Sequence, residues 1–239
     1  MRRVPFFVFA FLLSTTIFSC KKEDKTGHVH LNFTHKVDNA AIITDSIIYT
    51  NAAGYNYSIT NLNYYISGVV LTNEDNSTLT FDGPFYVDLE DAATHRHELE
   101  DVPVAKYKSI RFYIGLDAAK NVSNSLPSTN ANNNMAWPDP MGGGYHFMKL
   151  EGYYFNPSPT QSGFAMHLGK NANLVTCTIN NLGLELDDHG AELNLVMNVN
   201  EWFTNPNTYD FQIDGTSIMT NDASLLKLAQ NGVDVFTKE

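Results

Sequence analysis

Cysteine and positive charge are both scarce in this chain. Of its 239 residues only two are cysteines, Cys20 and Cys177, so no disulfide framework can be inferred. Cys177 stands alone in a strand-like stretch and is expected to be a small buried apolar residue. Lys and Arg number 15 against 26 Asp and Glu, which gives a formal net charge of -11. So acidic a protein repels nucleic acid, and no basic stripe with interleaved aromatic residues offsets this, which excludes nucleic-acid binding.

Long apolar runs are also missing. Residues 4–13 form an apolar run that is shorter than the roughly 20 residues that a membrane-spanning helix needs, and nothing else in the chain approaches that length. The run follows two arginines and leads into a short polar segment that ends at Ser19, which is the layout of a secretory signal. Because a small residue directly precedes Cys20, we expect residues 1–19 to be a lipoprotein signal peptide and Cys20 to carry the lipid. The alternative is a cleaved leader with an incidental cysteine.

The segment after Cys20 is short and charged. Residues 21–25 resemble the lipoprotein start common in Bacteroidota, and residues 20–27 as a whole are predicted to be a lipid-anchored tether. Loss of residues 1–19 removes two arginines and no acid, so the net charge moves from -11 to -13. We expect a protein of the cell envelope, at the outer membrane or cell surface, held to the membrane by its lipid alone. Residues 28–239 suit one β domain, because sandwiches of roughly 200 to 250 residues are ordinary.

Alternation of apolar and polar residues dominates this domain. It predicts half-buried strands at residues 29–35, 109–114 and 192–199. Residues 62–71 are instead apolar or aromatic at both odd and even positions, which suits a central strand covered on both faces. One helix is predicted over residues 223–230, with a capping side chain directly before it and a glycine after it. The many short strands with polar turns predict an all-β fold: an antiparallel β-sandwich, Greek-key and Ig-like, with one or two short helices.

Residues 117–144 interrupt the strand pattern. Their first part is rich in Asn, Ser and Ala, and the later part holds Trp137 beside prolines and ends in three glycines. A loop this long is usually functional or disordered. Because it leads directly into the aromatic strand predicted over residues 145–155, we expect a long inserted loop that is ordered and functional.

Eight histidines in an exported acidic protein suggest a metal site, because neutral imidazole is the commonest metal-binding side chain. His28 and His30 lie two apart on one strand face, a spacing that can hold a metal, but they adjoin the tether and are interpreted as a solvated face. His95 and His97 have the same spacing within an acidic loop, which favours ion pairing at the surface.

The remaining candidates differ in their surroundings. His146 and His189 stand among turn and strand residues with no evident partner and are interpreted as ordinary surface or hydrogen-bonded histidines. His167 lies in a strand whose apolar residues take one face and leave the imidazole on the other, just before Gly169. On these grounds a metal-binding role and a structural role both stay open for His167.

Several motifs follow one another in a fixed order along the chain. They are Tyr-Tyr-Ile-Ser-Gly-Val-Val-Leu at 64–71, Ile-Gly-Leu-Asp at 114–117, Asn121, Met-Ala-Trp at 135–137, Gly-Tyr-His-Phe-Met-Lys-Leu-Glu-Gly at 144–152 and His-Leu-Gly at 167–169. Together they resemble the MbnP-like copper-binding family, the periplasmic proteins of methanobactin operons, over roughly residues 29–236. The resemblance implies an exported β-rich protein that binds copper. In some members the copper lies beside a tryptophan that a diheme partner enzyme of the cytochrome-peroxidase type oxidises to kynurenine.

Carried over position by position, the resemblance implies His35 and His167 as metal ligands and Trp137 as the first tryptophan of the family's Met-x-Trp-x-Trp motif. Asp139 stands where the second tryptophan would be, which counts against tryptophan oxidation. Two imidazoles from distant strands can bind Cu(I), or Cu(II) with added oxygen ligands, and such a site forms only on folding. Glu151 either hydrogen-bonds a ligand imidazole or simply closes a turn.

Motifs of the common enzyme classes are missing from the sequence. We find no Gly-x-Ser-x-Gly motif and no cysteine with a credible base nearby, and the glycines at 142–144 lack the following helix that a phosphate site would need. We therefore expect copper capture or delivery without turnover. The alternative is a non-metal module in which Trp137, Tyr145, Tyr153 and Tyr154 present a surface to glycan or to a partner protein.

Overall fold

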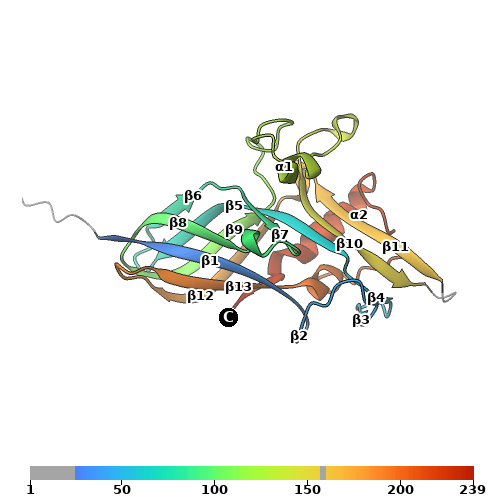
Figure 1. The fold of residues 1–239 in the computed structure, drawn as a ribbon, viewed down its shortest axis with the longest axis horizontal. Helices are drawn as coiled ribbons and strands as arrows, with labels where there is room; N and C mark the ends of the chain where they lie inside the picture. The colour runs from blue at the N-terminus through green and yellow to red at the C-terminus, as the bar shows by residue number, and fades with distance from the viewer. Residues whose placement is uncertain (1–24, 157–159) are drawn as a thin grey trace, which may run out of the picture.

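The computed structural model describes residues 25–156 and 160–239 (Figure 1). The predicted signal peptide, Cys20 as the predicted lipidation site and most of the predicted tether lie outside these residues. Within them, β structure begins at Thr26, slightly before the predicted domain boundary at residue 28. No helix in the described part of the chain is long and apolar enough to cross a membrane.

Strands make up most of the regular structure in the described residues. They are β1 (Thr26–Val37), β2 (Ala40–Ala41), β3 (Tyr49–Thr50), β4 (Asn56–Tyr57), β5 (Asn61–Asn73), β6 (Thr78–Phe81), β7 (Phe85–Asp88), β8 (Arg96–Pro103), β9 (Lys106–Ile114), β10 (His146–Phe155), β11 (Gln161–Gly169), β12 (Val175–Glu185), β13 (Ala191–Asn198) and β14 (Phe236–Lys238). The α-helices are α1 (Asn130–Asn134) and α2 (Asp222–Asn231), and the 3-10 helices are Ala92–Thr94, Asp139–Met141, Asn171–Asn173, Val199–Phe203 and Gly232–Asp234.

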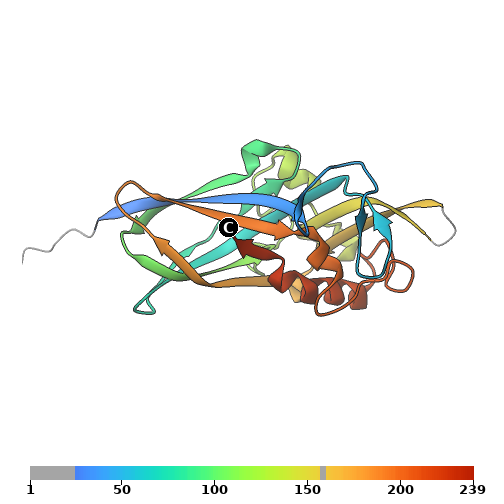
Figure 2. The same cartoon turned by 90° about the horizontal axis from the view of Figure 1, so that it is seen from below.

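The smaller sheet has the order β14-β13-β1-β2, with β8 also paired to β1. Its outer and inner faces follow from the alternation along β1, where Val29, Leu31 and Phe33 are fully buried and the residues between them are not. β1 pairs antiparallel with β8 but parallel with β13, as the neighbouring blue and orange strands of Figure 2 show. The fold is thus the predicted, mostly antiparallel sandwich, with one parallel pair that the sequence pattern did not indicate.

The larger sheet has the order β12-β9-β5-β10-β4-β3, with β11 beside β10 and both β6 and β7 beside β5. Across β5, β10 and β11, directly opposed residues share a face of the sheet. Tyr64, Met148 and Leu168 form one such row, and all three are fully buried on the face from which Tyr64 meets Phe33 of the smaller sheet. The neighbouring row, Asn63, Lys149 and His167, therefore points to the other side.

Aromatic rings fill the space between the sheets. Phe33 of the smaller sheet meets Tyr64 of the larger sheet at 6.4 Å between centroids, and Phe236 contacts both rings. Cys177 is 1% exposed in this core, as predicted, and burial raises the pKa of its thiol. Each fully buried ring of this kind contributes roughly 1.5 to 3 kcal/mol relative to an exposed one.

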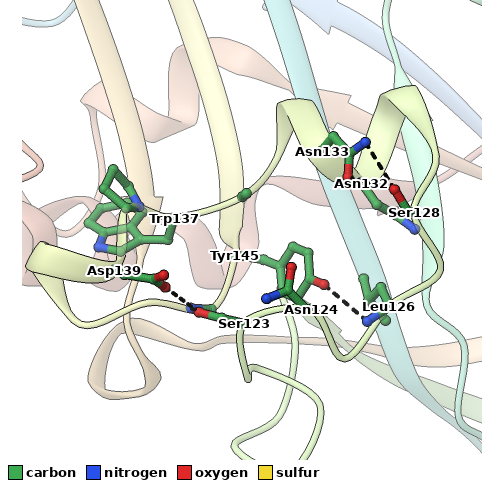
Figure 3. A pocket seen from close by; sticks show the side chains of 12 residues that line it. Ser123, Asn124, Leu126, Ser128, Asn132, Asn133, Trp137, Asp139 and Tyr145 are labelled. Atoms are coloured by element: carbon green, nitrogen blue, oxygen red, sulfur yellow. Dashed lines mark hydrogen bonds between the residues drawn. The ribbon is translucent and has the colours of Figure 1, made fainter.

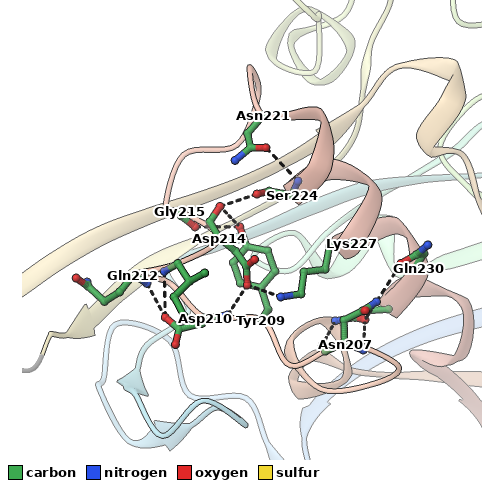
Figure 4. A network of polar contacts seen from close by, with 12 residues as sticks. Asn207, Tyr209, Asp210, Gln212, Asp214, Gly215, Asn221, Ser224, Lys227 and Gln230 are labelled. Atoms are coloured by element: carbon green, nitrogen blue, oxygen red, sulfur yellow. Dashed lines mark hydrogen bonds and ion pairs between the residues drawn. The ribbon is translucent and has the colours of Figure 1, made fainter.

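The C-terminal helix forms where the capping pattern predicts it. The Asn221 side chain caps α2 by accepting from Ser224 N at 3.2 Å, and Gly232 follows the last turn. Lys227 of α2 pairs with Asp214 at 2.6 Å, and Ser224 Oγ donates to the Asp214 carbonyl, as Figure 4 shows. These contacts fix the irregular segment before the helix to α2.

The segment 117–144 is folded over the outer side of the larger sheet. It contains α1, which lies beyond the end of β11 in Figure 1, and the 3-10 turn Asp139–Met141. Tyr65 of β5 donates from Oη to Asn132 Oδ1 at 2.7 Å and packs edge-on against Tyr145. The inserted loop is therefore ordered, as expected, although α1 within it was not predicted.

Candidate metal centre

The two histidines implied by the family resemblance do not meet. His35 on β1 lies 3.0 Å from Tyr64 Oη, measured from Nε2, and so it sits on the inner side of the larger sheet. His167 on β11 belongs to the row that points to the outer side of the same sheet. The sheet itself separates the two imidazoles, and each has a different histidine as its neighbour.

His167 is held by a carboxylate. Its Nε2 lies 2.6 Å from Glu151 Oε1, because the β10–β11 register places Glu151 opposite Ala165, diagonal to His167 on the same face. The hydrogen bond from His167 holds the pKa of Glu151 below its usual range, against the effect of partial burial. An ionised carboxylate only accepts, so Nε2 of His167 carries the proton and the lone pair of the neutral ring is on Nδ1.

His146 is the neighbour of His167, and the sequence analysis missed it. The two ring centroids are 5.0 Å apart with the planes at 89°. The pairing of β10 with β11 shifts register between His146 and Met148, so the alternation pattern does not predict where the His146 side chain points. The one available signal was its position inside the Gly-Tyr-His-Phe motif, two residues after Gly144.

The nitrogens of His146 have distinct surroundings. Nδ1 lies 3.1 Å from the Met135 carbonyl, which only accepts, so Nδ1 donates. Nε2 is buried and has no hydrogen-bond partner among the described residues. Burial, and secondarily the nearby His167, lower the pKa of His146 to about 4. At neutral pH the ring is therefore uncharged, with an unused lone pair on Nε2 in a protected position.

Trp137 packs over this pair. The indole is 2% exposed, lies 4.8 Å from the His146 ring between centroids, and donates from Nε1 to the Met141 carbonyl at 3.2 Å. A Cβ on Gly169 would collide with the indole, which explains the glycine of the His-Leu-Gly run. The prolines beside Trp137 restrict the backbone that carries it.

A cavity of about 450 Å³ is lined by residues of the inserted loop, including Trp137, and by Tyr145 (Figure 3). Its wall is tied together by Ser123 Oγ, which donates to Asp139 Oδ1 at 2.6 Å, and by Tyr145 Oη, which accepts from Leu126 N at 3.0 Å. Asp139 is exposed on this wall. The position of the family's second tryptophan is therefore at the surface here, while Trp137 is buried.

His35 and His95 form a second histidine pair. Their ring centroids lie 5.5 Å apart. Burial, and secondarily the nearby His95, lower the pKa of His35 to about 3. His95 Nε2 donates to the Asp88 carbonyl at 2.7 Å, which leaves its Nδ1 lone pair available in the neutral ring. The interpretation of His95 and His97 as surface ion-pairing residues is wrong, because His97 also contacts a carbonyl, that of Tyr86, and packs on Phe85.

Comparison with known proteins gives one family. A model of the MbnP family matches residues 26–220, which is well over half of the chain. MbnP from Methylosinus trichosporium has a similar solved structure, with a TM-score of 0.59 at 12% identity, covering 90% of this chain and 98% of that one. At this identity the structural similarity shows the fold alone. No curated protein matches the chain significantly. The family match, together with the sandwich that both chains share, shows that the chain belongs to the MbnP family.

Proposed function

We propose that this protein binds copper between His146 and His167, and that it captures or delivers the metal in the cell envelope as a lipid-anchored protein without turnover of its own. The observation that carries the proposal is the buried Nε2 of His146, which has no hydrogen-bond partner in the described residues although it lies next to a second imidazole. Leaving a buried polar atom unpaired costs about 1 to 3 kcal/mol, which a bound metal would offset.

The donor set suits copper. The two free lone pairs are Nε2 of His146 and Nδ1 of His167, and imidazole is a ligand that copper accepts in both oxidation states. Glu151 would keep His167 in the required tautomer and orientation, a role whose loss typically weakens metal affinity about 10- to 100-fold. Trp137 would exclude water from one side, since its ring covers His146.

His35 stays a proposed copper ligand, with His95 in place of His167 as its partner. The supporting observation is that both residues are half-buried with their rings in contact, and that His95 retains an Nδ1 lone pair when its Nε2 donates to Asp88. Because the two pairs lie on opposite sides of the sheet, they would act as separate copper positions with separate affinities.

Cu(I) titration of the full chain, purified in detergent and monitored with a competing chelator, tests both positions. His146→Ala and His167→Ala should each weaken the tighter binding at least about tenfold, and His35→Ala should remove a second equivalent while leaving the first. His189→Ala is the matched control, because that side chain is 90% exposed and lies 3.8 Å from the neighbouring Asp188. Wild-type affinity in both His146→Ala and His167→Ala would show that the assignment is wrong.

The burial of the aromatic residues disfavours the alternative of a glycan- or protein-binding surface. Stacking on a sugar needs exposed rings. Trp137, Tyr145 and Tyr154 are 2%, 4% and 3% exposed, so of the four residues considered only Tyr153, at 46%, presents its ring to solvent. A single exposed tyrosine does not make the aromatic platform that this function requires.

A further inference from the structure

A different group of metal-binding side chains lies on the outer face of the smaller sheet. His28 and His30 alternate with the buried residues of β1, so both point away from the core. The registers of β1 with β8 and β13 place Glu98 and Glu192 directly opposite His30, one on each side. Three strands thus bring two imidazoles and two carboxylates into one surface cluster.

Glu98 stands close to both histidines without bonding to either. Its carboxylate oxygens lie 3.7 Å from His30 Nε2 and 4.0 Å from His28 Nδ1, beyond the usual limit of about 3.2 Å for a hydrogen bond. The three ligand atoms all lie within 4.8 Å of one another. Two ligands of a tetrahedral ion with bonds of about 2.1 Å are roughly 3.4 Å apart, so small side-chain rotations would close the group around a metal.

His28 is oriented by the backbone beneath it. Its ring lies against Gly190, which has φ +94, and a Cβ on that glycine would collide with Nε2, Cδ2 and Cε1 of the imidazole. The His28 and His30 rings meet edge to face at 4.6 Å between centroids. The missing side chain at residue 190 therefore makes the space in which His28 turns its Nδ1 toward Glu98.

His30 is supported on its other side. Its Nδ1 lies 3.3 Å from Glu192 Oε1, and Glu192 is itself fixed by Arg96 and by Asn32 Nδ2, each at 2.7 Å. A carboxylate beside one ring nitrogen favours the proton on that nitrogen and leaves the other nitrogen to face a metal. Glu192 would therefore position His30, while Glu98 would be the ligand.

We propose that His28, His30 and Glu98 form a surface site for a divalent transition-metal ion of the zinc type. Two imidazoles and one carboxylate supply three of the four ligands of tetrahedral Zn²⁺, and the fourth position faces solvent, since Glu98 is 46% and His28 39% exposed at the side chain. This site shares no residue with the two copper positions and does not depend on them.

Isothermal titration of the full chain, purified in detergent, with Zn²⁺ alone tests the site. One zinc equivalent should be weakened at least about tenfold by His30→Ala, by His28→Ala and by Glu98→Gln. His189→Ala controls for the loss of an ordinary exposed histidine. The double variant His146→Ala/His35→Ala controls for zinc bound at the proposed copper positions. Neither control should change the affinity of this equivalent.

Because the three side chains point away from the core, the variants should keep the wild-type unfolding temperature of the metal-free protein. Glu98→Gln is nearly isosteric and keeps the test valid even where a histidine variant folds poorly. The proposal is overturned if Glu98→Gln and His30→Ala bind zinc as the wild type does. It is also overturned if the wild type binds no zinc equivalent beyond those removed by the His146→Ala and His35→Ala substitutions.

Discussion

Trp137 is enclosed by His146, Gly169 and its own loop, and this setting bears on its chemistry. An enzyme could not reach the buried indole directly, so oxidation by a diheme partner, which the family resemblance implies, would require electron transfer through the protein. The second aromatic position is an exposed aspartate, hydrogen-bonded to Ser123. The geometry favours Trp137 as a cover over the histidine pair.

We expect Trp137 to be unmodified in protein isolated from the native host. Peptide mass spectrometry of the segment that contains residue 137 measures this, because conversion to kynurenine replaces one carbon atom by one oxygen atom in the residue's mass. Trp202, which is also buried, provides an internal comparison for oxidation during handling. Kynurenine at 137 with intact tryptophan at 202 would contradict the expectation and would support the diheme partner.

His146 and His35 are the other residues with unusual environments, and burial is the first cause of both lowered pKa values, about 4 and about 3. In the unfolded chain each histidine titrates near pH 6.5. As the pH falls from 6.5 toward 4, the unfolded chain binds protons at these positions and the folded protein does not. The stabilisation that comes from these two neutral histidines is therefore fully present above pH 6.5. As the pH falls below 6.5, the free energy of unfolding decreases by at most about 1.4 kcal/mol per pH unit for each histidine.

Denaturant unfolding of the metal-free protein between pH 7 and pH 4.5 measures this loss. We expect the free energy of unfolding to fall less steeply in the variant His35→Gln/His146→Gln than in the wild type, because glutamine takes up no proton. His189→Gln should follow the wild type, since that side chain is exposed in the folded protein. Equal pH slopes for the double variant and the wild type would disprove the prediction.

At the scale of elements, sequence patterns predicted what depends on local periodicity. The cap and glycine around α2 and the alternation in β1 each appear where they were expected, because both rest on neighbours within a few residues. The His146–His167 pair could not be predicted in this way. It depends on a register shift at the start of β10 and on the pairing of β10 with β11, neither of which leaves a periodic signal.

Local sequence patterns also could not predict that His35 and His167 lie on opposite sides of the larger sheet. Both lie on predicted strands, but whether their side chains meet depends on which face of a shared sheet each one approaches. That is decided by the contact of Tyr64 with His35 and by the row that joins His167 to Asn63, contacts between residues far apart in sequence. The family resemblance implied His35 as the partner of His167, but His95 is the histidine next to His35. Of the two roles left open for Glu151, the structure shows the hydrogen bond with His167.

At the scale of the whole molecule, the proposed lipid anchor would decide where the proposed metal sites operate. We expect Cys20→Ser to move the protein from the membrane fraction to the soluble fraction, because the remaining chain has no apolar run long enough to span a bilayer. Fractionation with immunoblotting measures the shift, and Cys177→Ser is the matched control because that thiol is buried in the core. Retention of the Cys20→Ser protein in washed membranes would contradict lipid attachment at this residue.

The parallel pairing of β1 with β13 has a consequence for how the molecule matures. The first strand finds its partner about 160 residues later, at Val29 opposite Ala191, so the smaller sheet cannot close until the chain through β13 is available for folding. His28, His30 and Glu98 lie on β1 and β8, and Glu192 lies on β13, directly opposite His30. Because Glu192 lies beside His30, the proposed zinc cluster gains its supporting carboxylate only after β13 has paired with β1, whereas the His146–His167 pair needs only β10 and β11.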